Sequence, residues 1–261
     1  MQGSKLAVYV NGDSQTIGTD LSNDGASYAY HLVNHLGGKM IANPAIGGAS
    51  IDRILRTTHQ YLDDCETNYR GENFPVMANN VADAFPDFVI IGWTEYSRFD
   101  WFYEGKIRSC KAELDGLGPD EVKLEKNLPR KLWQETKLIG DGGPALIRYF
   151  YNQIMNLHSR LEHLKIPHLF LNAHAGFYDE YGVEHRKNTM ATDLFEEFDW
   201  QNCFWNVFER EDASFTSWAG KRGYKHVPGW HYEHMAHVYF AKLMHDYIRK
   251  NDLLNMYKET V

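Results

Sequence analysis

The chain has 261 residues, with 27 Lys and Arg against 35 Asp and Glu, so its formal net charge is -8. This length is enough for one large domain with a substantial core, which excludes the small scaffolds held together by disulfides. The acidic balance gives no overall positive field, so we expect neither nucleic acid nor an anionic membrane surface as a partner. The hydrophobic fraction of 43% is typical of a folded globular protein.

The three cysteines, Cys65, Cys110 and Cys203, are far apart and form no C-x-x-C pair. They therefore predict neither a disulfide framework nor a thiolate metal site, and no cofactor is indicated. The first apolar stretch ends at Val10, which is too short for a signal-peptide core, and no apolar run reaches about 18 residues. We expect a soluble, cytoplasmic protein.

Apolar runs and helical periodicity alternate along the chain. Short apolar runs between turn residues predict strands, and apolar residues at helical spacing predict helices. Strands are expected at residues 6–10, 40–42, 88–91 and 168–171, and helices at residues 25–36, 51–62, 146–164 and 233–250. Ser50 is expected to cap the second of these helices. This alternation predicts an α/β fold with a doubly wound, mostly parallel sheet.

Two stretches interrupt the alternation. Residues 95–143 lose periodicity and mix charged residues with Gly and Pro, and residues 178–224 are irregular and rich in Phe and Trp. No internal repeat or low-complexity linker separates two halves. We therefore expect a single domain, residues 1–261, with two insertions.

Polar and glycine residues follow the predicted strands. Gly12, Asp13 and Ser14 come after the first strand, residues 43–48 after the second and residues 92–95 after the third. In an open α/β sheet, ligands bind beyond the carboxyl ends of the strands, so these segments are expected to converge there.

This pattern resembles the SGNH, or GDSL-type, hydrolase family. Ser14, in Gly-Asp-Ser, stands where the family has its nucleophile. Asn43, Gly48 and Ser50 are similar to the second block, which makes Gly48 the oxyanion-hole glycine. In the third block, Gly-x-Asn, Thr94 occupies the asparagine position. The resemblance implies a five-stranded, flavodoxin-like sheet, and residues 92–98 also look like the corresponding segment of phage-encoded members, for which a virion or host-cell location would be expected.

The fifth block carries the catalytic histidine, followed by a small residue at five and an alanine at ten. His231, with Ala236 and Ala241, fits this spacing. Family members usually place an Asp two or three residues before the histidine, but here those positions are Pro228 and Gly229. The acid that orients the histidine is therefore open, with Glu233, Glu211 and Asp212 as nearby candidates.

The residue types suit acyl transfer. A serine hydroxyl becomes a good nucleophile when a neighbouring base takes its proton, and histidine is the side chain suited to that at neutral pH. The backbone N–H groups of Ser14 and Gly48 would stabilise the oxyanion. Thr94 could add a hydroxyl donor, with a shorter reach than an amide.

Other interpretations remain open. Ser14 could be a turn or cap residue, and His234 is a rival base, although Tyr239 and Met244 fit the spacing less well. The histidines near residues 226–245 could bind a metal, but they match no zinc motif. The absence of G-x-S-x-G and of phosphate-binding glycine motifs disfavours an α/β-hydrolase fold and nucleotide use.

Aromatic residues cluster after the third block and before His231. Either they pack the insertions against the body, or they form a platform for a sugar ring or an acyl chain. We assign substrate binding to Asp13, Trp93, Arg98 and Trp230. The sequence thus predicts a serine hydrolase that cleaves a carboxylic ester, such as an O-acyl group on a carbohydrate. The alternative is a binding or structural module that keeps the fold but has lost efficient turnover.

Overall fold

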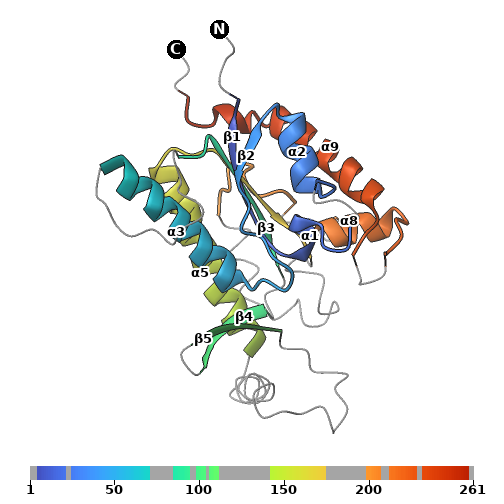
Figure 1. Cartoon of the computed structure of the whole chain (residues 1–261), viewed down its shortest axis with the longest axis horizontal. Coiled ribbons are helices and arrows are strands. Elements are labelled where there is room, and N and C mark those ends of the chain that lie inside the picture. Colours follow the sequence, from blue (N-terminus) through green and yellow to red (C-terminus); the bar gives the residue numbers. More distant parts are fainter. Residues whose placement is uncertain are drawn as a thin grey trace.

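The computed structural model of the chain describes residues 5–21, 25–70, 85–94, 98–103, 106–111, 142–174, 198–206, 212–227 and 231–258. Within them, one parallel sheet lies between two layers of helices, and a small antiparallel hairpin lies beside it (Figure 1). The predicted α/β class is confirmed.

The parallel sheet contains four strands. They are β1 (Ala7–Asn11), β2 (Lys39–Ala42), β3 (Phe88–Trp93) and β6 (His168–Asn172), in the order β2-β1-β3-β6. This is the flavodoxin-like order, in which β1 and β3 flank the point where the winding direction reverses. All residues of β3 and β6 are buried, as expected for strands covered on both faces.

The fifth strand of the prediction is not confirmed. Beside β6, where a fifth strand would lie, the described chain makes two isolated parallel bridges, one between Phe170 and Phe204 and one between Asn172 and Ser214. The backbone N–H of Phe170 donates to the carbonyl of Cys203 at 2.7 Å, and the N–H of Trp205 donates to the carbonyl of Phe170 at 2.8 Å. The described sheet therefore ends in isolated bridges rather than in a full strand.

Helices cover both faces of the sheet (Figure 1). The helix α3 (Ile51–Arg70) and the helix α5 (Gly142–His163) pack on one face. On the other face lie α2 (Tyr28–His35), α8 (Phe215–Lys221) and α9 (His234–Lys250). Alternate residues of β1 belong to the two cores, with Tyr9 in the first and Val8 and Val10 in the second. Because successive side chains of a strand point to opposite faces of the sheet, β1 contributes to both cores.

Helix starts agree with the sequence. Ser50 Oγ accepts a hydrogen bond from the N–H of Arg53 at 3.0 Å, which confirms its capping role for α3. Ser27 caps α2 in the same way through the N–H of Tyr30 at 3.3 Å. Two short helices complete the described chain, α1 (Ser14–Ile17) after β1 and the 3-10 turn η1 (Leu253–Asn255) after α9.

The first predicted insertion begins with an antiparallel hairpin of β4 (Arg98–Tyr103) and β5 (Lys106–Lys111). Asp100 ties this hairpin to the start of α3, because its carboxylate accepts from Ser50 Oγ and pairs with Arg56. Residues 112–141 and 175–197, which make up much of the two predicted insertions, lie outside the described residues.

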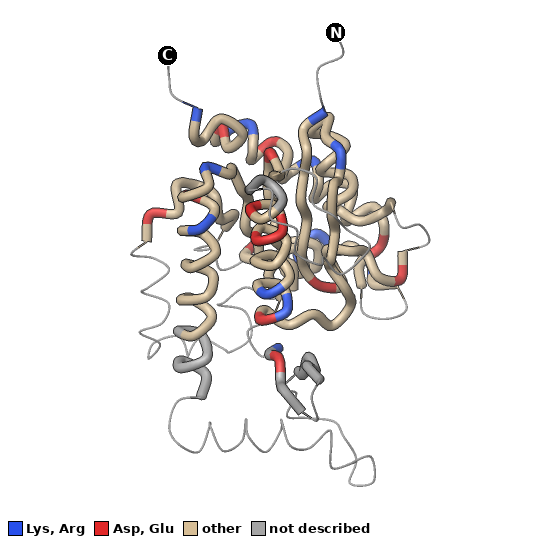
Figure 2. The backbone as a smooth tube through the Cα atoms, turned by 60° about the vertical axis from the view of Figure 1, so that its left-hand side comes forward, with Lys and Arg blue, Asp and Glu red and all other residues tan. Residues whose placement is uncertain are grey.

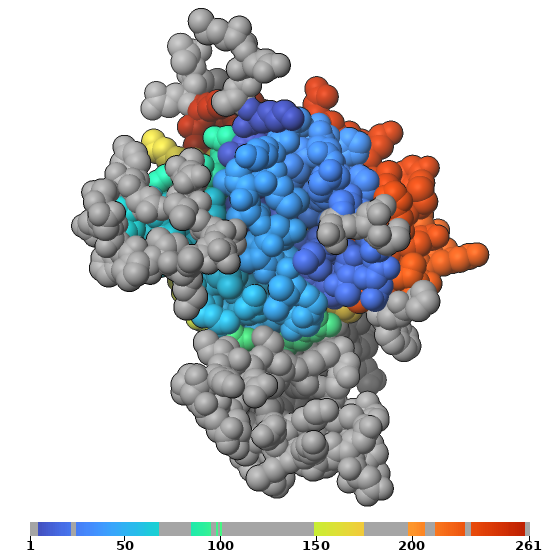
Figure 3. Space-filling model, viewed as in Figure 1, coloured from blue at the N-terminus to red at the C-terminus, as the bar shows by residue number. Residues whose placement is uncertain are grey.

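Charged residues of both signs occur throughout the described chain. Basic and acidic residues are interspersed along the described backbone (Figure 2). In the space-filling view, the segment from β1 to α3 forms one face of the body, beside the C-terminal helices (Figure 3). None of the described helices has the length and apolar composition that a membrane span requires.

Candidate active site

The carboxyl ends of β1 and β3 lie side by side. Asn11 faces Ile91 in the parallel ladder, so Gly12 and Gly92 follow at the same level of the sheet. A Cβ on Gly92 would meet Thr16 Oγ1 at 2.3 Å, and a Cβ on Gly12 would meet the same oxygen at 2.2 Å. Only residues without a Cβ let α1 sit directly on the strand ends, which explains both glycines.

Ser14 is the first residue of α1, immediately beyond β1. Asp13 caps this helix, since its Oδ1 accepts from the N–H of Gln15 at 3.0 Å. The helix ends after one turn at Gly18, which has a left-handed conformation with φ of 79°. Ser14 is 5% exposed, and its hydroxyl makes no hydrogen bond to any described residue. The geometry leaves this hydroxyl available for a substrate or a base.

The loop after β2 lies next to Ser14. A Cβ built on Gly47 would be 3.9 Å from Ser14 Cβ and 3.5 Å from Thr19 Oγ1. Its neighbour Gly48 has a left-handed backbone, with φ of 73°, and a Cβ built on it would meet nothing within 4 Å. The predicted nucleophile and the loop with the predicted oxyanion-hole glycine are therefore brought together.

His231 is held by a short turn before α9. The N–H of Val227 donates to the carbonyl of His231 at 2.8 Å, and the N–H of Glu233 donates to the carbonyl of Lys225 at 2.9 Å. The imidazole Nδ1 of His231 lies 2.6 Å from Asp20 Oδ2. This carboxylate comes from the turn after α1, at the other end of the sequence.

Asp20 links His231 to the Ser14 helix. The N–H of Thr19 donates to the carbonyl of Ser14 at 2.9 Å, and Asp20 is the next residue. No hydrogen bond joins Ser14 Oγ to His231 in the described structure, although both residues are described. Such bonds are often long in a free enzyme and shorten when substrate binds. The arrangement offers a hydroxyl, an imidazole and a carboxylate at one edge of the sheet.

Thr94 follows β3 at this same edge. It is 2% exposed, and its Oγ1 has no hydrogen-bond partner among the described residues. A buried hydroxyl without a partner is uncommon, because its desolvation costs free energy. Thr94 therefore keeps a donor free where the family pattern places an asparagine.

Asp13 and Arg98 form a buried charged pair. The Nη1 of Arg98 lies 3.9 Å from Asp13 Oδ2, and both side chains are largely excluded from solvent. The positive charge of Arg98 balances the buried negative charge of Asp13, which caps α1. For both residues, contact with substrate remains a prediction.

Trp93 lies in the core and not on a rim. Its exposed fraction is 0%, and its ring packs against Phe170 with centroids 5.3 Å apart. Trp218 is also buried, against Phe215 and Phe240. For these two residues the packing interpretation is the better one, because a side chain without exposed area offers a ligand no surface. Trp230 lies outside the described residues.

The rival base His234 faces a different partner. Its Nε2 lies 3.0 Å from Nε2 of His31 on α2. The pKa of His31 is lowered by partial burial and by the neighbouring His234 and His35. Between His231 and His234, only His231 has a carboxylate bound to its ring in the described structure, which favours it as the base.

The acids proposed from the sequence are engaged elsewhere. Glu233 Oε1 accepts from the N–H of Lys225 at 3.0 Å, and Asp212 pairs with Arg222 at 3.2 Å. Glu211 lies outside the described residues. Asp20 was missed because it is 211 positions from His231. Its only signal in the sequence is an acid in a turn shortly after the nucleophile.

Within the described residues, one group of three side chains could hold a metal ion: His158, His168 and Cys203. His158 Nδ1 lies 2.8 Å from His168 Nε2, and His168 Nδ1 lies 3.0 Å from the carbonyl of Ile166. Burial raises the pKa of the Cys203 thiol and lowers that of His168 to about 3. These hydrogen bonds engage both ring nitrogens of His168, whereas Nε2 of His158 lies 3.5 Å from Glu162 Oε1 without a hydrogen bond. His168 begins β6, so the group is at the amino edge of the sheet, opposite Ser14.

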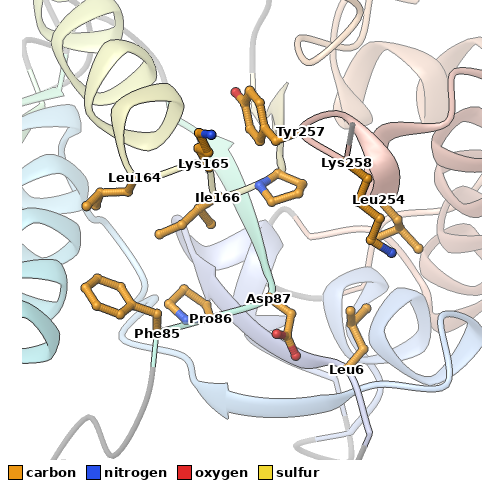
Figure 4. A pocket seen from close by; sticks show the side chains of 11 residues that line it. Leu6, Phe85, Pro86, Asp87, Leu164, Lys165, Ile166, Leu254, Tyr257 and Lys258 are labelled. Atoms are coloured by element: carbon orange, nitrogen blue, oxygen red, sulfur yellow. The ribbon is translucent and has the colours of Figure 1, made fainter. Parts of the chain in front are cut away.

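A hollow of about 480 Å³ is also found at the amino edge. Its lining includes Leu6, Asp87 and Ile166, which precede β1, β3 and β6 (Figure 4). Asp87 Oδ2 accepts from the N–H of Ala7 at 2.7 Å, so this carboxylate has a structural role. The hollow is therefore distinct from the edge that carries Ser14.

No protein-family model and no curated protein matches the chain. Several solved structures are similar to it. One is the psychrotrophic esterase EstA from Pseudoalteromonas sp., inhibited by monoethylphosphonate, with 14% identity over 94% of this chain and 98% of that chain and a TM-score of 0.48.

Another is a GDSL-like lipase from Parabacteroides merdae, with 15% identity over 96% of this chain and 97% of that chain and a TM-score of 0.43. A third is the two-domain esterase CEX, active on acetylated mannans, with 14% identity over 95% of this chain and 50% of that chain and a TM-score of 0.43. All three are esterases or lipases.

Proposed function

We propose that this chain is a serine esterase of the SGNH type, with Ser14 as nucleophile and His231 as general base. The observation that carries the proposal is the arrangement at the carboxyl edge of the sheet. There, His231 is hydrogen-bonded to the carboxylate of Asp20. Thr19, the residue before Asp20, donates its N–H to the carbonyl of Ser14. The free hydroxyl of Ser14 and the adjacent Gly47 loop support the same assignment.

The reaction proceeds through an acyl-enzyme. Ser14 Oγ forms a bond to the ester carbonyl carbon while its proton passes to Nε2 of His231. The bond from carbon to the leaving oxygen then breaks, and the same proton passes to the departing alcohol. Water repeats the attack with His231 as base, which releases the carboxylic acid and restores the Ser14 hydroxyl.

Backbone and side-chain donors stabilise the oxyanion. The N–H groups of Ser14 and Gly48 are the proposed donors, and the unpartnered Oγ1 of Thr94 is the third. A threonine hydroxyl reaches less far than an asparagine amide. We therefore expect turnover below that of an otherwise identical site with three well-placed donors.

The substrate is a carboxylic ester, and we propose an O-acyl group on a carbohydrate. Trp230, which directly precedes His231, and Arg98 beside Asp13 are the residues assigned to it. Turnover of an acetylated oligosaccharide should then exceed that of p-nitrophenyl acetate in kcat/KM. A preference for the activated ester, with no release of acetate from the sugar, would remove the carbohydrate assignment and leave the esterase.

Covalent labelling tests the nucleophile. A fluorescent organophosphonate should label the wild type once, on the peptide that contains Ser14. Ser14→Ala should not be labelled, whereas Ser27→Ala, which loses only a helix-capping hydroxyl, should be labelled like the wild type. Equal labelling of wild type and Ser14→Ala would refute the proposal.

A second function is a binding module that keeps the fold with little turnover. It is favoured by Thr94 in the asparagine position and by the unformed hydrogen bond between Ser14 and His231. Under this alternative, the wild type would hydrolyse no short-chain ester yet would bind an acetylated glycan in calorimetry.

A further inference from the structure

We infer that Asp20 is the positioning carboxylate of the catalytic histidine, supplied by the turn after the nucleophile instead of by the residues before His231. This inference rests on the proposed function, because it gives His231 the role of base. Asp20 would thus replace the acid that the family pattern has two or three residues before the histidine, where this chain has Pro228 and Gly229.

The contact between the two residues is short and direct. Asp20 Oδ2 lies 2.6 Å from His231 Nδ1, the distance of a hydrogen bond between charged or strongly polar groups. The His231 side chain is 13% exposed and that of Asp20 38% exposed. The imidazole is therefore mostly enclosed, while the carboxylate remains accessible from solvent.

The backbone of the turn brings Asp20 to this position. After Gly18, the chain reverses, and the N–H of Leu21 donates to the carbonyl of Gly18 at 3.1 Å. Asp20 has a left-handed backbone, with φ of 68°. Asp and Asn are the side-chain-bearing residues that accept this region most readily. The turn thus accommodates aspartate readily, and aspartate also provides the carboxylate.

The contact fixes the tautomer that the reaction needs. A carboxylate can only accept a hydrogen bond, so Nδ1 of His231 carries the proton and Nε2 keeps its lone pair. Nε2 can then take the Ser14 proton. The carboxylate also stabilises the imidazolium that forms, as the buried Asp does in the Ser-His-Asp template.

The other described carboxylates that were candidates for this role, and Asp13 beside Ser14, are engaged elsewhere. Glu233 accepts from the backbone of Lys225, and Asp212 pairs with Arg222. Asp13 caps α1 and faces Arg98. Asp20 and Ser14 belong to one segment of seven residues, so the positioning acid and the nucleophile are fixed in one compact unit and only the base comes from the distant C-terminal part.

The test compares Asp20→Asn with Asp246→Asn. Asn keeps the left-handed turn but offers an N–H that favours the wrong tautomer. We expect kcat on p-nitrophenyl acetate to fall on the order of 1,000- to 10,000-fold, with KM changed less than about threefold. Asp246 pairs with His245 Nδ1 at 3.3 Å on the surface of α9, so Asp246→Asn removes a similar pair away from the site and should keep wild-type turnover.

Chemical rescue separates positioning from folding. Asp20→Gly fits the left-handed backbone and leaves space for a small carboxylate beside His231. Added formate should raise its kcat at least about tenfold and should not change Ser14→Ala or the wild type. A merely structural role predicts no rescue.

The outcomes distinguish a failure of the positioning role of Asp20 from a failure of the proposed function. An active, organophosphonate-labelled wild type whose Asp20→Asn variant turns over within about threefold of it would overturn the positioning role alone. A wild type that neither hydrolyses esters nor reacts at Ser14 would overturn the proposed function together with this inference. A large loss of kcat, rescued by formate in Asp20→Gly, would establish the role.

Discussion

Ser14 lies three residues after Asn11, and Thr94 lies three residues after Ile91. Asn11 and Ile91 face each other across β1 and β3. Two adjacent parallel strands therefore end in a nucleophile candidate and a free hydroxyl at the same level of the sheet. Parallel strands point their carboxyl ends to one edge, so residues some 80 positions apart in the chain can share a site.

Thr94→Val should lower turnover without weakening the fold. Valine has the shape of threonine but lacks the hydroxyl, and Thr94 Oγ1 has no described partner to lose. We expect kcat to fall by up to about 100-fold. This loss is no larger than the smallest that removal of an oxyanion-hole donor typically causes. The free energy of unfolding should stay the same or rise, because an unsatisfied buried group is removed. Ester hydrolysis and urea denaturation measure the two effects. An unchanged kcat would exclude Thr94 as a donor.

Gly92→Ala should destabilise the protein strongly. The new Cβ would lie 2.3 Å from Thr16 Oγ1 and 2.4 Å from Tyr28 Oη, two hydroxyls that bond to each other at 2.8 Å. We expect a loss of about 2 kcal/mol or more in the free energy of unfolding, as overpacking of a core typically costs. Gly47→Ala is the matched control near Ser14, since its Cβ would meet nothing closer than 3.5 Å. Equal stabilities of the two variants in urea denaturation would contradict the close approach of α1 to the strand ends.

Stability should decrease as the pH falls below about 6.5. Burial, with a smaller contribution from neighbouring histidines, lowers the pKa of both His168 and His237 to about 3. Between that value and the pKa of an unfolded histidine, the unfolded chain binds more protons, so acid favours unfolding. From pH 6.5 to pH 5 each histidine should cost about 2 kcal/mol. Urea denaturation at pH 7 and pH 5 measures the difference.

His237→Asn is the control for this pH dependence. An asparagine oxygen can accept the N–H of Tyr28, which donates to His237 Nδ1 at 3.1 Å in the wild type, but it does not titrate. The drop in stability between pH 7 and pH 5 should shrink by about 2 kcal/mol in this variant. A drop as large as in the wild type would mean that His237 is not the group responsible.

Strong chelators should leave ester hydrolysis intact. The proposed acyl transfer uses the hydroxyl of Ser14 and the imidazole of His231. The group of His158, His168 and Cys203 lies at the opposite edge of the sheet. Treatment with EDTA or phenanthroline followed by desalting should retain the wild-type kcat. Loss of activity that a divalent ion restores would instead support a metal-dependent hydrolase.

The sequence alone determined most of the described architecture. Short apolar runs placed β1, β2, β3 and β6 within two residues of their observed limits, since strands covered on both faces are mostly apolar and even the partly buried β2 is apolar over Met40–Ala42. Helical periodicity placed α2, α3, α5 and α9, although α3 extends to Arg70, further than residues 51–62. Local propensity and burial pattern carry this information because each depends on neighbouring residues in the chain.

Only the tertiary structure decided the environment of the site. Asp20 reaches His231 through a turn whose direction depends on a left-handed backbone, and no spacing rule relates two residues 211 positions apart. Trp93 comes two residues after the expected strand, where a rim residue would be placed, yet it belongs to β3 and packs in the core against Phe170. In the described residues, the fifth strand is reduced to two isolated bridges, at Phe204 and Ser214. These features are set by which segments meet in space, and the sequence pattern records only what each segment prefers by itself.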